Sequence, residues 1–308
     1  MFMYTFIVNP NARSGLGHKV WNELETILKK ENVKYQVFFT KYRKHATDIT
    51  RQITSDENEH VVVALGGDGT VNEVVNGIVN IDKTTLGYIP IGSSNDFARG
   101  HAIPKDAKEA LKVVLSAPKY EMMNIGLLEY KNTVRRFAVS TGFGFDAGIC
   151  HEVVVSHLKK FLNKLGLGKL TYVGVALHHL FVCKPANIKL ILDGEKEIIY
   201  PKTLFVATMN SKFEGGGAKF CPKANAGDDK LDLCIISNIP KLKALMLIPT
   251  AFMGCHTIFK GVYTHTCKTA EIHADIPQAL HTDGEPLFIQ RDTRVSCLPE
   301  KLRLIVEK

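Results

Sequence analysis

The chain has 308 residues, of which 45% are hydrophobic and 23% are charged, a composition typical of a globular protein large enough for two domains. Its formal net charge of +8 suggests an anionic partner, such as a nucleotide, a nucleic acid or a membrane surface. The seven cysteines are scattered without a C-x-x-C pair, which argues against a disulfide framework or a zinc site and favours reduced thiols in the cytosol.

The first third of the chain alternates strand and helix patterns. Strands are expected at residues 2–9, 35–40, 60–65 and 86–91, and helices at residues 19–30, 45–53 and 70–79. This alternation is the βαβ pattern of a parallel sheet with helices on both faces.

From about Tyr120 the pattern changes to short alternating runs, typical of an antiparallel β domain. The runs lie at residues 136–140, 187–192, 203–208, 231–236 and 294–297, and two helical stretches, 147–163 and 169–183, interrupt them. We therefore expect an α/β domain at residues 1–122 and a mainly antiparallel β domain at residues 123–298. Residues 299–308 form a further strand that could return to the first domain.

The most informative stretch follows the third expected strand, where the apolar run 61–65 ends in Gly66-Gly67-Asp68-Gly69-Thr70. Glycines between a strand and a helix start let the backbone approach a phosphate, and the first N–H groups of the helix point at it. A carboxylate at Asp68 is compatible with such a cradle if a divalent cation lies between the carboxylate and the phosphate. The alternative is a tight turn with an N-cap aspartate.

Small and polar residues also follow the other expected strands. Asn9 follows the first strand, Thr40 the second, and Ser94-Asn95-Asp96 the fourth. In a parallel sheet these ends share the edge at which open α/β sheets bind ligands. For Asn9 and Thr40 a local turn or cap is the alternative, and for 94–96 it is a helix N-cap.

Taken in order, these segments resemble the motifs of the diacylglycerol kinase catalytic family, which includes bacterial soluble lipid kinases and the sphingosine and ceramide kinases. The resemblance rests on Asn9-Pro10 with Gly15, on 66–70 with Asn72-Glu73, on Gly92-Ser93-Ser94-Asn95-Asp96-Phe97-Ala98-Arg99, and on Thr282-Asp283-Gly284-Glu285. It covers essentially the whole chain. NAD kinases and phosphofructokinases share the G-G-D-G element, but the segment 95–99 favours lipid kinases.

The resemblance implies ATP as the phosphoryl donor and Mg²⁺ as the metal. The turn of Gly66, Gly67, Gly69 and Thr70 would cradle the ATP phosphates. Asn9, Thr40, Ser94, Asn95 and Glu73 would line the nucleotide cleft, although Glu73 has the alternative of a solvated helix residue.

The resemblance also implies three carboxylates with chemical roles. Asp68 would hold the catalytic Mg²⁺, directly or through water, and Asp96 could support the same ion. Glu285 would be the general base, completing the site from the second domain and deprotonating the acceptor hydroxyl within hydrogen-bond reach. The alternative for Glu285 is an ordinary turn residue, because Asp283-Gly284 is a common hairpin signal.

Two positions depart from the family pattern. Bacterial members often have an aspartate before Ile/Leu-Gly at the start of the second domain, where it joins the magnesium network, whereas this chain has Asn124-Ile125-Gly126. The segment 221–233 resembles a loop that binds a structural magnesium in some relatives, with Asp228 as the best ligand, but its usual Asp-Gly pair is Asp-Asp here. A plain acidic loop is the alternative.

The sequence also bears on membranes and nucleic acids. The segment His157–Tyr172 mixes lysines with leucines and could lie on an anionic bilayer, or it could be a solvated helix with an apolar inner face. The N-terminus shows no signal peptide, and the longest apolar run, 244–255, contains Pro249 and is too short to span a bilayer. No helix-turn-helix, zinc finger or aromatic RNA-binding motif is evident, so nucleic acid is disfavoured.

We therefore expect an ATP- and Mg²⁺-dependent lipid kinase that is cytoplasmic and peripheral at the inner membrane face. The expected acceptor is diacylglycerol, and the product is then phosphatidic acid. The alternatives are a kinase of another lipid such as a sphingoid base, an NAD-kinase-like activity, and a non-catalytic nucleotide-sensing lipid-binding protein. The sequence leaves the oligomeric state open, a homodimer included.

Overall fold

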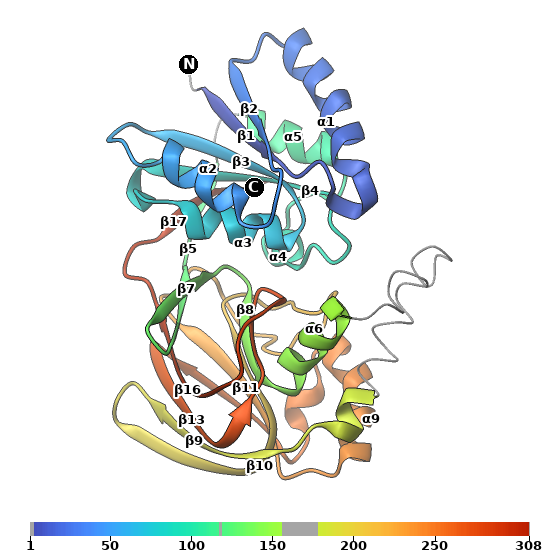
Figure 1. Ribbon diagram of the computed structural model, residues 1–308, viewed down its shortest axis with the longest axis vertical. Helices are drawn as coiled ribbons and strands as arrows, with labels where there is room; N and C mark the ends of the chain where they lie inside the picture. The colour runs from blue at the N-terminus through green and yellow to red at the C-terminus, as the bar shows by residue number, and fades with distance from the viewer. Residues whose placement is uncertain (1–2, 117–118, 156–177, 308) are drawn as a thin grey trace.

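The computed structural model describes residues 3–116, 119–155 and 178–307, and these form two units stacked along the long axis of the molecule (Figure 1). The N-terminal unit is a mainly parallel sheet with helices on both faces, and the C-terminal unit consists mainly of antiparallel strands. The predicted fold class is confirmed.

The first sheet contains β2 (Tyr35–Phe39), β1 (Tyr4–Val8), β3 (His60–Gly66), β4 (Thr84–Pro90), β17 (Leu302–Ile305) and β5 (Tyr120–Met123), in this spatial order. The pairs from β2 to β17 are parallel, and β5 is antiparallel to β17. The strand β17 comes from the C-terminal end of the chain and lies between β4 and β5. The carboxyl ends of β1 to β4 consequently lie along one edge.

The helices of this unit are α1 (Ala12–Lys30), α2 (His45–Ile53), α3 (Asp68–Gly77), η1 (Ile81–Lys83), α4 (Asp96–Gly100) and α5 (Ala107–Leu115). Helix α1 packs with α5 on one face of the sheet, and α2 packs with α3 on the other (Figure 1). Residues Val62, Val63, Ala64 and Leu65 are fully buried, as expected for a strand covered on both faces.

Among the described residues, the second sheet has eleven strands. Its main path runs β15 (Glu285–Pro286), β14 (Leu280–Thr282), β8 (Ser140–Gly144), β10 (Lys196–Met209), β9 (Ala186–Leu192), β13 (Thr269–Gln278), β16 (Gln290–Cys297), β6 (Gly126–Tyr130) and β7 (Thr133–Phe137). Strand β11 (Leu231–Ser237) pairs with β10 and with β12 (Val262–Cys267).

The helical elements of the second unit are α6 (Phe145–Val155), α9 (Lys241–Met253), η2 (His256–Ile258) and a short turn at residues 178–182. Much of the two predicted helices 147–163 and 169–183, and the whole of the basic segment 157–172, lies outside the described residues. Within the described ranges, no helix combines the length and apolarity needed to cross a bilayer.

The predicted strand at 136–140 is wrong, because the chain leaves β7 at Phe137 and enters β8 only at Ser140. The backbone N–H groups of Ala138, Val139 and Ser140 donate to the side chain of Asp283 at 2.8–2.9 Å. Backbone donors that turn toward one carboxylate cannot continue a strand ladder, so the segment breaks there.

Candidate functional site

A cavity of about 430 Å³, which we call cavity 1, lies at the carboxyl edge of the first sheet. Its walls come from the ends of all four parallel strands β1 to β4 and from one residue of the second unit. The lining residues are Asn9, Asn11, Ala12, Arg13, Thr40, Lys41, Tyr42, Arg43, Gly67, Gly69, Thr70, Glu73, Gly92 and Glu285. Three cations and a glycine turn therefore border one polar cavity, which suits a polyphosphate.

Close backbone contact explains two of the glycines. A Cβ atom at Gly92 would lie 2.7 Å from the Gly67 Cα, so the turns after β3 and β4 touch only because both residues lack side chains. Helix α3 begins at Asp68 directly behind this contact. The Thr70 and Val71 N–H groups donate to the Gly67 carbonyl (2.9 and 3.2 Å), so the N–H groups that remain for a ligand at the cavity wall are those before Thr70.

Asp68 accepts hydrogen bonds from the N–H groups of Asp96 (3.2 Å) and Phe97 (3.1 Å). It thus caps the start of the neighbouring helix α4, whereas its own helix has a glycine, Gly67, at the N-cap position and therefore no side-chain cap. Burial raises the pKa of the Asp68 carboxyl. The carboxylate therefore joins the turn after β3 to the turn after β4.

Asp96 is 5% exposed and lies beside Asp68. Its carboxylate accepts from the Arg99 guanidinium (3.3 Å) and from the N–H of Gly216 (2.7 Å), which belongs to the second unit. Burial, with a further contribution from the charge of Asp68, raises the pKa of Asp96 to about 6. The two aspartates offer hard oxygen ligands of the kind that Mg²⁺ prefers.

Ser94 and Asn95 do not line cavity 1. The Asn95 side chain donates to the Gly92 carbonyl (3.1 Å) and accepts from the Tyr88 hydroxyl (3.3 Å), so it holds the turn after β4. Ser94 lies on the other side of this turn, where it lines the second cavity described below.

Glu73 lines cavity 1, but its carboxylate is used within the protein. It accepts from the backbone N–H groups of Lys44 (2.8 Å) and Ala46 (3.2 Å), and so caps helix α2 from a different helix. This contact fixes the loop that carries Arg43. Asn9 donates to the Thr70 hydroxyl (3.4 Å) and joins the first and third strand ends in the same way.

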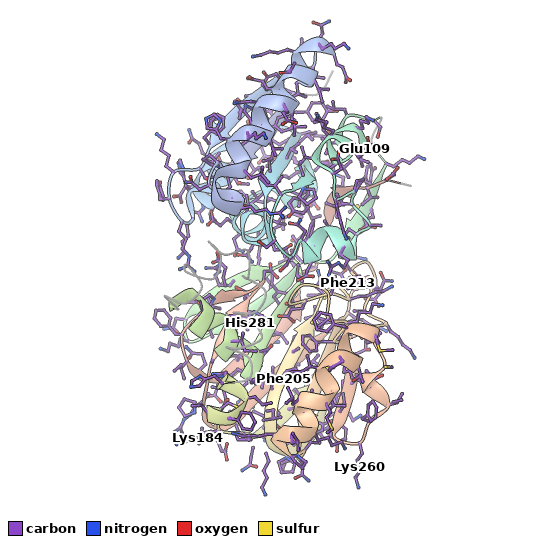
Figure 2. All side chains as sticks on the ribbon, turned by 90° about the vertical axis from the view of Figure 1, so that its right-hand side faces the viewer. Glu109, Lys184, Phe205, Phe213, Lys260 and His281 are labelled. Carbon is purple, nitrogen blue, oxygen red and sulfur yellow. The ribbon has the colours of Figure 1, made fainter. Side chains whose placement is uncertain are left out.

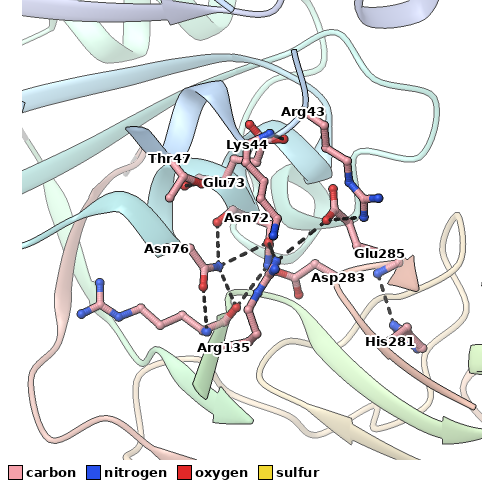
Figure 3. A network of polar contacts seen from close by, with 12 residues as sticks. Arg43, Lys44, Thr47, Asn72, Glu73, Asn76, Arg135, His281, Asp283 and Glu285 are labelled. Carbon is pink, nitrogen blue, oxygen red and sulfur yellow. Dashed lines mark hydrogen bonds and ion pairs between the residues drawn. The ribbon is translucent and has the colours of Figure 1, made fainter. Parts of the chain in front are cut away.

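Asp283 and Glu285 belong to the hairpin between β14 and β15 (Figure 3). Asp283 and Gly284 both have positive φ angles, 45° and 77°, as in the two-residue hairpin turn that an Asp-Gly pair favours. Glu285 accepts from Arg43 (3.2 Å) and lies 3.8 Å from the Arg135 guanidinium. The hairpin alternative and a role at the cavity are thus compatible.

Asp283 is the residue whose importance the sequence reasoning missed. Besides the three N–H groups of residues 138–140, it accepts from the Asn72 side chain of α3 (2.8 Å), while Asn72 also accepts from Arg135 (3.1 Å) (Figure 3). One carboxylate therefore joins the two units and places the Glu285 turn against the start of α3. A Cβ atom at Gly69 would lie 3.6 Å from a Glu285 oxygen.

A second cavity of about 560 Å³, cavity 2, lies between the second sheet and helices α6 and α9. Its polar end contains Asp68, Ser94, Asp96, Asp146, Glu214 and Asp283. The remainder is mostly apolar and includes Phe145, Ile149, Leu180, Leu204, Phe205, Ile236, Ala244, Leu247, Ile248, Ala251 and Phe252. Phe205 lies in the middle of the second unit in Figure 2.

The two cavities share a wall. Gly67, Gly69 and Glu285 face cavity 1, whereas Asp68 and Gly284 face cavity 2. Asp68 and Glu285 are therefore on opposite sides of this wall rather than in one cavity. Two adjoining compartments, one polar and one apolar, meet at a row of carboxylates.

Asp146, Glu214 and the fully buried His281 form a compact group at the polar end of cavity 2, with His281 Nε2 3.3 Å from Asp146 and 3.0 Å from Glu214. Its residue types suit a metal. However, the Gly284 N–H donates to Nδ1 of His281 (3.2 Å), which leaves the ring proton on Nε2, facing the carboxylates. A metal would need the Nε2 lone pair, so the group is better described as a hydrogen-bonded triad.

Asn124 and Asp228 lie away from these carboxylates. The Asn124 side chain contacts the loop 221–233 by accepting from the Asp229 N–H (3.3 Å) and donating to the Lys230 carbonyl (3.3 Å), and it lines neither cavity. Asp228 is exposed on that loop and accepts from the Lys230 N–H (3.1 Å).

Two family models match the chain, one in each half. Residues 3–125 match the diacylglycerol kinase catalytic domain, and residues 140–306 match the YegS C-terminal NAD kinase beta sandwich-like domain.

Curated relatives agree with these matches. A Bacillus subtilis (strain 168) protein named "Putative lipid kinase YtlR" is 30% identical, with 99% of each chain covered. The diacylglycerol kinase of Mycobacterium tuberculosis (strain ATCC 25618 / H37Rv) is 29% identical over 79% of this chain and 76% of its own.

Among solved structures, a "putative diacylglycerol kinase" from Bacillus anthracis str. Sterne has a TM-score of 0.77 at 20% identity, covering 99% of this chain and 97% of that chain. An NAD kinase from Archaeoglobus fulgidus in complex with ATP has a TM-score of 0.51 at 10% identity, covering 99% of this chain and 93% of that chain. At these identities both support the fold alone.

Replacing Asp283 with alanine is expected to destabilise the protein by roughly 3 kcal/mol or more, because its buried donors lose their acceptor. Urea denaturation measures the loss. Asp275→Ala is the matched control, since Asp275 is exposed and also accepts from one backbone N–H and one asparagine side chain. Equal losses in the two variants would contradict the anchoring role.

The raised pKa of Asp96 gives a prediction for stability against pH without metal. Between about pH 4 and pH 6 the folded state binds this proton more tightly than the unfolded state, so the stabilisation from protonation is lost as pH rises, by up to about 3 kcal/mol. Asp96→Asn should therefore exceed the wild type in melting temperature above pH 6 and lose that advantage toward pH 4.

Thermal unfolding in a chelating buffer across this range is the measurement. Asp82→Asn, at an exposed carboxylate, serves as the control and should follow the wild type. An Asp96→Asn advantage that grows on acidification would refute the assigned direction.

Proposed function

Because the chain belongs to the diacylglycerol kinase family of lipid kinases, we propose that it transfers the γ-phosphoryl group of ATP to a hydroxyl of a membrane lipid. The proposed acceptor is diacylglycerol, and the product is then phosphatidic acid. The observation that carries this proposal is that a polar cavity and an apolar cavity adjoin at the turns that carry Asp68 and Glu285. Phosphoryl transfer needs a held phosphate, a positioned hydroxyl and charge neutralisation between them.

Cavity 1 is the donor side in this proposal. Arg13, Lys41 and Arg43 supply positive charge around the glycine turn at Gly67 and Gly69. Guanidinium and ammonium groups bind phosphate through charge-assisted hydrogen bonds, and the start of α3 adds N–H donors. Thr40 and Asn9 complete the edge nearest the nucleotide.

Asp68 and Asp96 would hold Mg²⁺. Each carboxylate accepts few hydrogen bonds within the protein and keeps further lone pairs for a cation or its water shell. The ion, when bound, neutralises developing charge on the phosphates. The raised pKa values of both carboxyls agree with a site that stabilises a cation among buried acids.

Glu285 is proposed as the general base, and its arginine partners connect its state to nucleotide binding. Arg43 borders cavity 1 and currently pairs with Glu285. Phosphates arriving in cavity 1 would compete for the Arg43 guanidinium and leave the Glu285 carboxylate freer to accept a proton. The base would thus become available when the donor is in place.

Cavity 2 is the acceptor side. Its apolar walls suit acyl chains, and its polar end brings a headgroup to Asp68 and Asp96. An apolar compartment of this kind favours a lipid over NAD as the acceptor. The positive net charge supports work at an anionic membrane surface on the cytoplasmic side.

One observation favours a second class of acceptor. One oxygen each of Asp146 and Glu214 is buried without a hydrogen-bond partner among the described residues. Diacylglycerol has one free hydroxyl to donate, whereas a sphingoid base adds an ammonium group and a second hydroxyl. A panel of lipids with labelled ATP tests the choice, and the lipid with the highest kcat/KM identifies the acceptor class.

Asp68→Asn and Glu285→Gln are each expected to lower phosphoryl transfer by about 10²-fold or more, because one removes a metal ligand and the other the base. Labelled-phosphate transfer to diacylglycerol in mixed micelles is the assay. Glu109→Gln, at an exposed glutamate of α5, is the control. Near-normal rates in both test variants, or equal losses in the control, would overturn these roles.

A bulky side chain in cavity 2 should discriminate between acceptors by chain length. Ala251→Trp fills the apolar end and is expected to lower kcat/KM for long-chain diacylglycerol about tenfold more than for a short-chain analogue. The ratio of the two values in one variant is independent of the amount of folded enzyme. An unchanged ratio would show that acyl chains lie elsewhere.

A further inference from the structure

Helix α9 carries apolar side chains on two opposite sides. Ala244, Leu247 and Ala251 are buried and line cavity 2. On the opposite side, Leu242, Met246 and Met253 are 61%, 66% and 73% exposed. Their spacing of four and seven residues places them in one stripe of an α-helix. A helix with apolar residues on both sides is expected to be covered on both sides.

The exposed stripe continues into its surroundings. Phe252 in the last turn of α9, Ile258 in η2 and Phe259 directly after η2 are 47%, 79% and 38% exposed. Phe181 and Val182 are also exposed, and the Lys241 amino group donates to the carbonyls of Phe181 and Cys183. We call Leu242, Met246, Phe252, Met253, Ile258 and Phe259 the α9 patch.

The chain segment that forms this patch has charged residues of one sign. The sequence has no aspartate or glutamate between Asp232 and Glu271, while Lys241, Lys243 and Lys260 lie in α9 and after η2. The Lys243 amino group donates to the Lys260 carbonyl, which keeps these lysines together. In Figure 2, Lys184 and Lys260 lie at the same end of the molecule as α9.

The lysines at the start of α9 are placed unfavourably for the helix alone. Lys241 and Lys243 lie in its first turn, which contains no acidic residue. Cations at a helix N-terminus oppose the helix dipole, and a nearby anion offsets that cost. An external anionic surface would supply that nearby negative charge.

The position of the patch relative to cavity 2 selects the occupant. Only the thickness of one helix, about 10 Å, separates the exposed stripe from the acceptor compartment. An apolar stripe with a basic rim is the arrangement by which helices lie in the interface of an anionic bilayer.

We propose that the α9 patch docks on an anionic lipid bilayer, with its methionine and phenylalanine side chains at the boundary of headgroups and acyl chains and Lys241, Lys243 and Lys260 on lipid phosphates. This inference rests on the proposed lipid kinase function. It explains why α9 has two apolar faces, one toward the acceptor cavity and one toward solvent. The acceptor would enter cavity 2 from the membrane on which α9 lies.

The test is sedimentation of the full chain with vesicles of phosphatidylglycerol and phosphatidylcholine in equal parts. The double substitution Met246→Ser and Met253→Ser is expected to weaken vesicle binding at least about tenfold. The variant lacks two large apolar side chains whose transfer from water into the bilayer stabilises the bound state. Val134→Ser with Ile199→Ser is the matched control, at positions 60% and 68% exposed on other elements, and should bind as the wild type does. Binding should also fall with added salt and with pure phosphatidylcholine.

Activity on a short-chain acceptor dissolved as monomers provides the second measurement. The α9 variant should retain that activity, which shows that it is folded, and lose activity on vesicles. Equal vesicle binding of the α9 variant and wild type overturns the proposal. A second outcome also overturns it: the wild type is a dimer, and the α9 variant is a monomer that still binds vesicles as the wild type does. The patch would then be a contact between two copies of the chain.

The two proposals can fail separately. Sedimentation requires no phosphoryl transfer, so vesicle binding through the α9 patch without kinase activity would overturn the proposed function alone. If the protein phosphorylates monomeric lipid but the α9 substitutions leave vesicle binding unchanged, only the proposed docking surface would be overturned.

Discussion

The contact on which this molecule depends is the buried carboxylate of Asp283. It accepts hydrogen bonds from three consecutive backbone N–H groups of the second unit and from the Asn72 side chain of the first unit. The same interaction ends β7, begins β8 and fixes the turn that carries Glu285. A buried carboxylate requires such a full set of donors, so the relative position of the two units is specified by hydrogen bonds as well as by packing.

This junction produces two compartments with different chemistry. Cavity 1 is bordered by glycine turns and cations, and cavity 2 by apolar side chains and carboxylates. A hydrophilic phosphate donor and a lipid acceptor can then bind without sharing a solvent environment. The loop at Gly216 contributes to the same junction, because its N–H donates to Asp96 across the units. The reaction is proposed to occur where the compartments meet.

The sequence predicted the parallel sheet and the strand ends well, because buried strands followed by glycine and polar turns have a local pattern. It could not assign the partners of those residues. Glu73 lines cavity 1 as expected, but no sequence pattern indicated that its carboxylate also caps α2, or that the Asn95 side chain holds the turn after β4. Asp283 and His281 have roles set by contacts more than a hundred residues away. Cavity 2 is likewise formed by segments whose apolar patterns resemble ordinary core.

In the proposed reaction, donor and acceptor occupy separate cavities on either side of the Asp68–Glu285 wall. A crystal structure with a non-hydrolysable ATP analogue, Mg²⁺ and a short-chain acceptor lipid tests it most directly. We expect the triphosphate in cavity 1 against Gly67 and Gly69, the acyl chains in cavity 2 against Phe205 and Ala251, and the acceptor hydroxyl facing the wall between them. Nucleotide in cavity 2, or acyl chains in cavity 1, would contradict it.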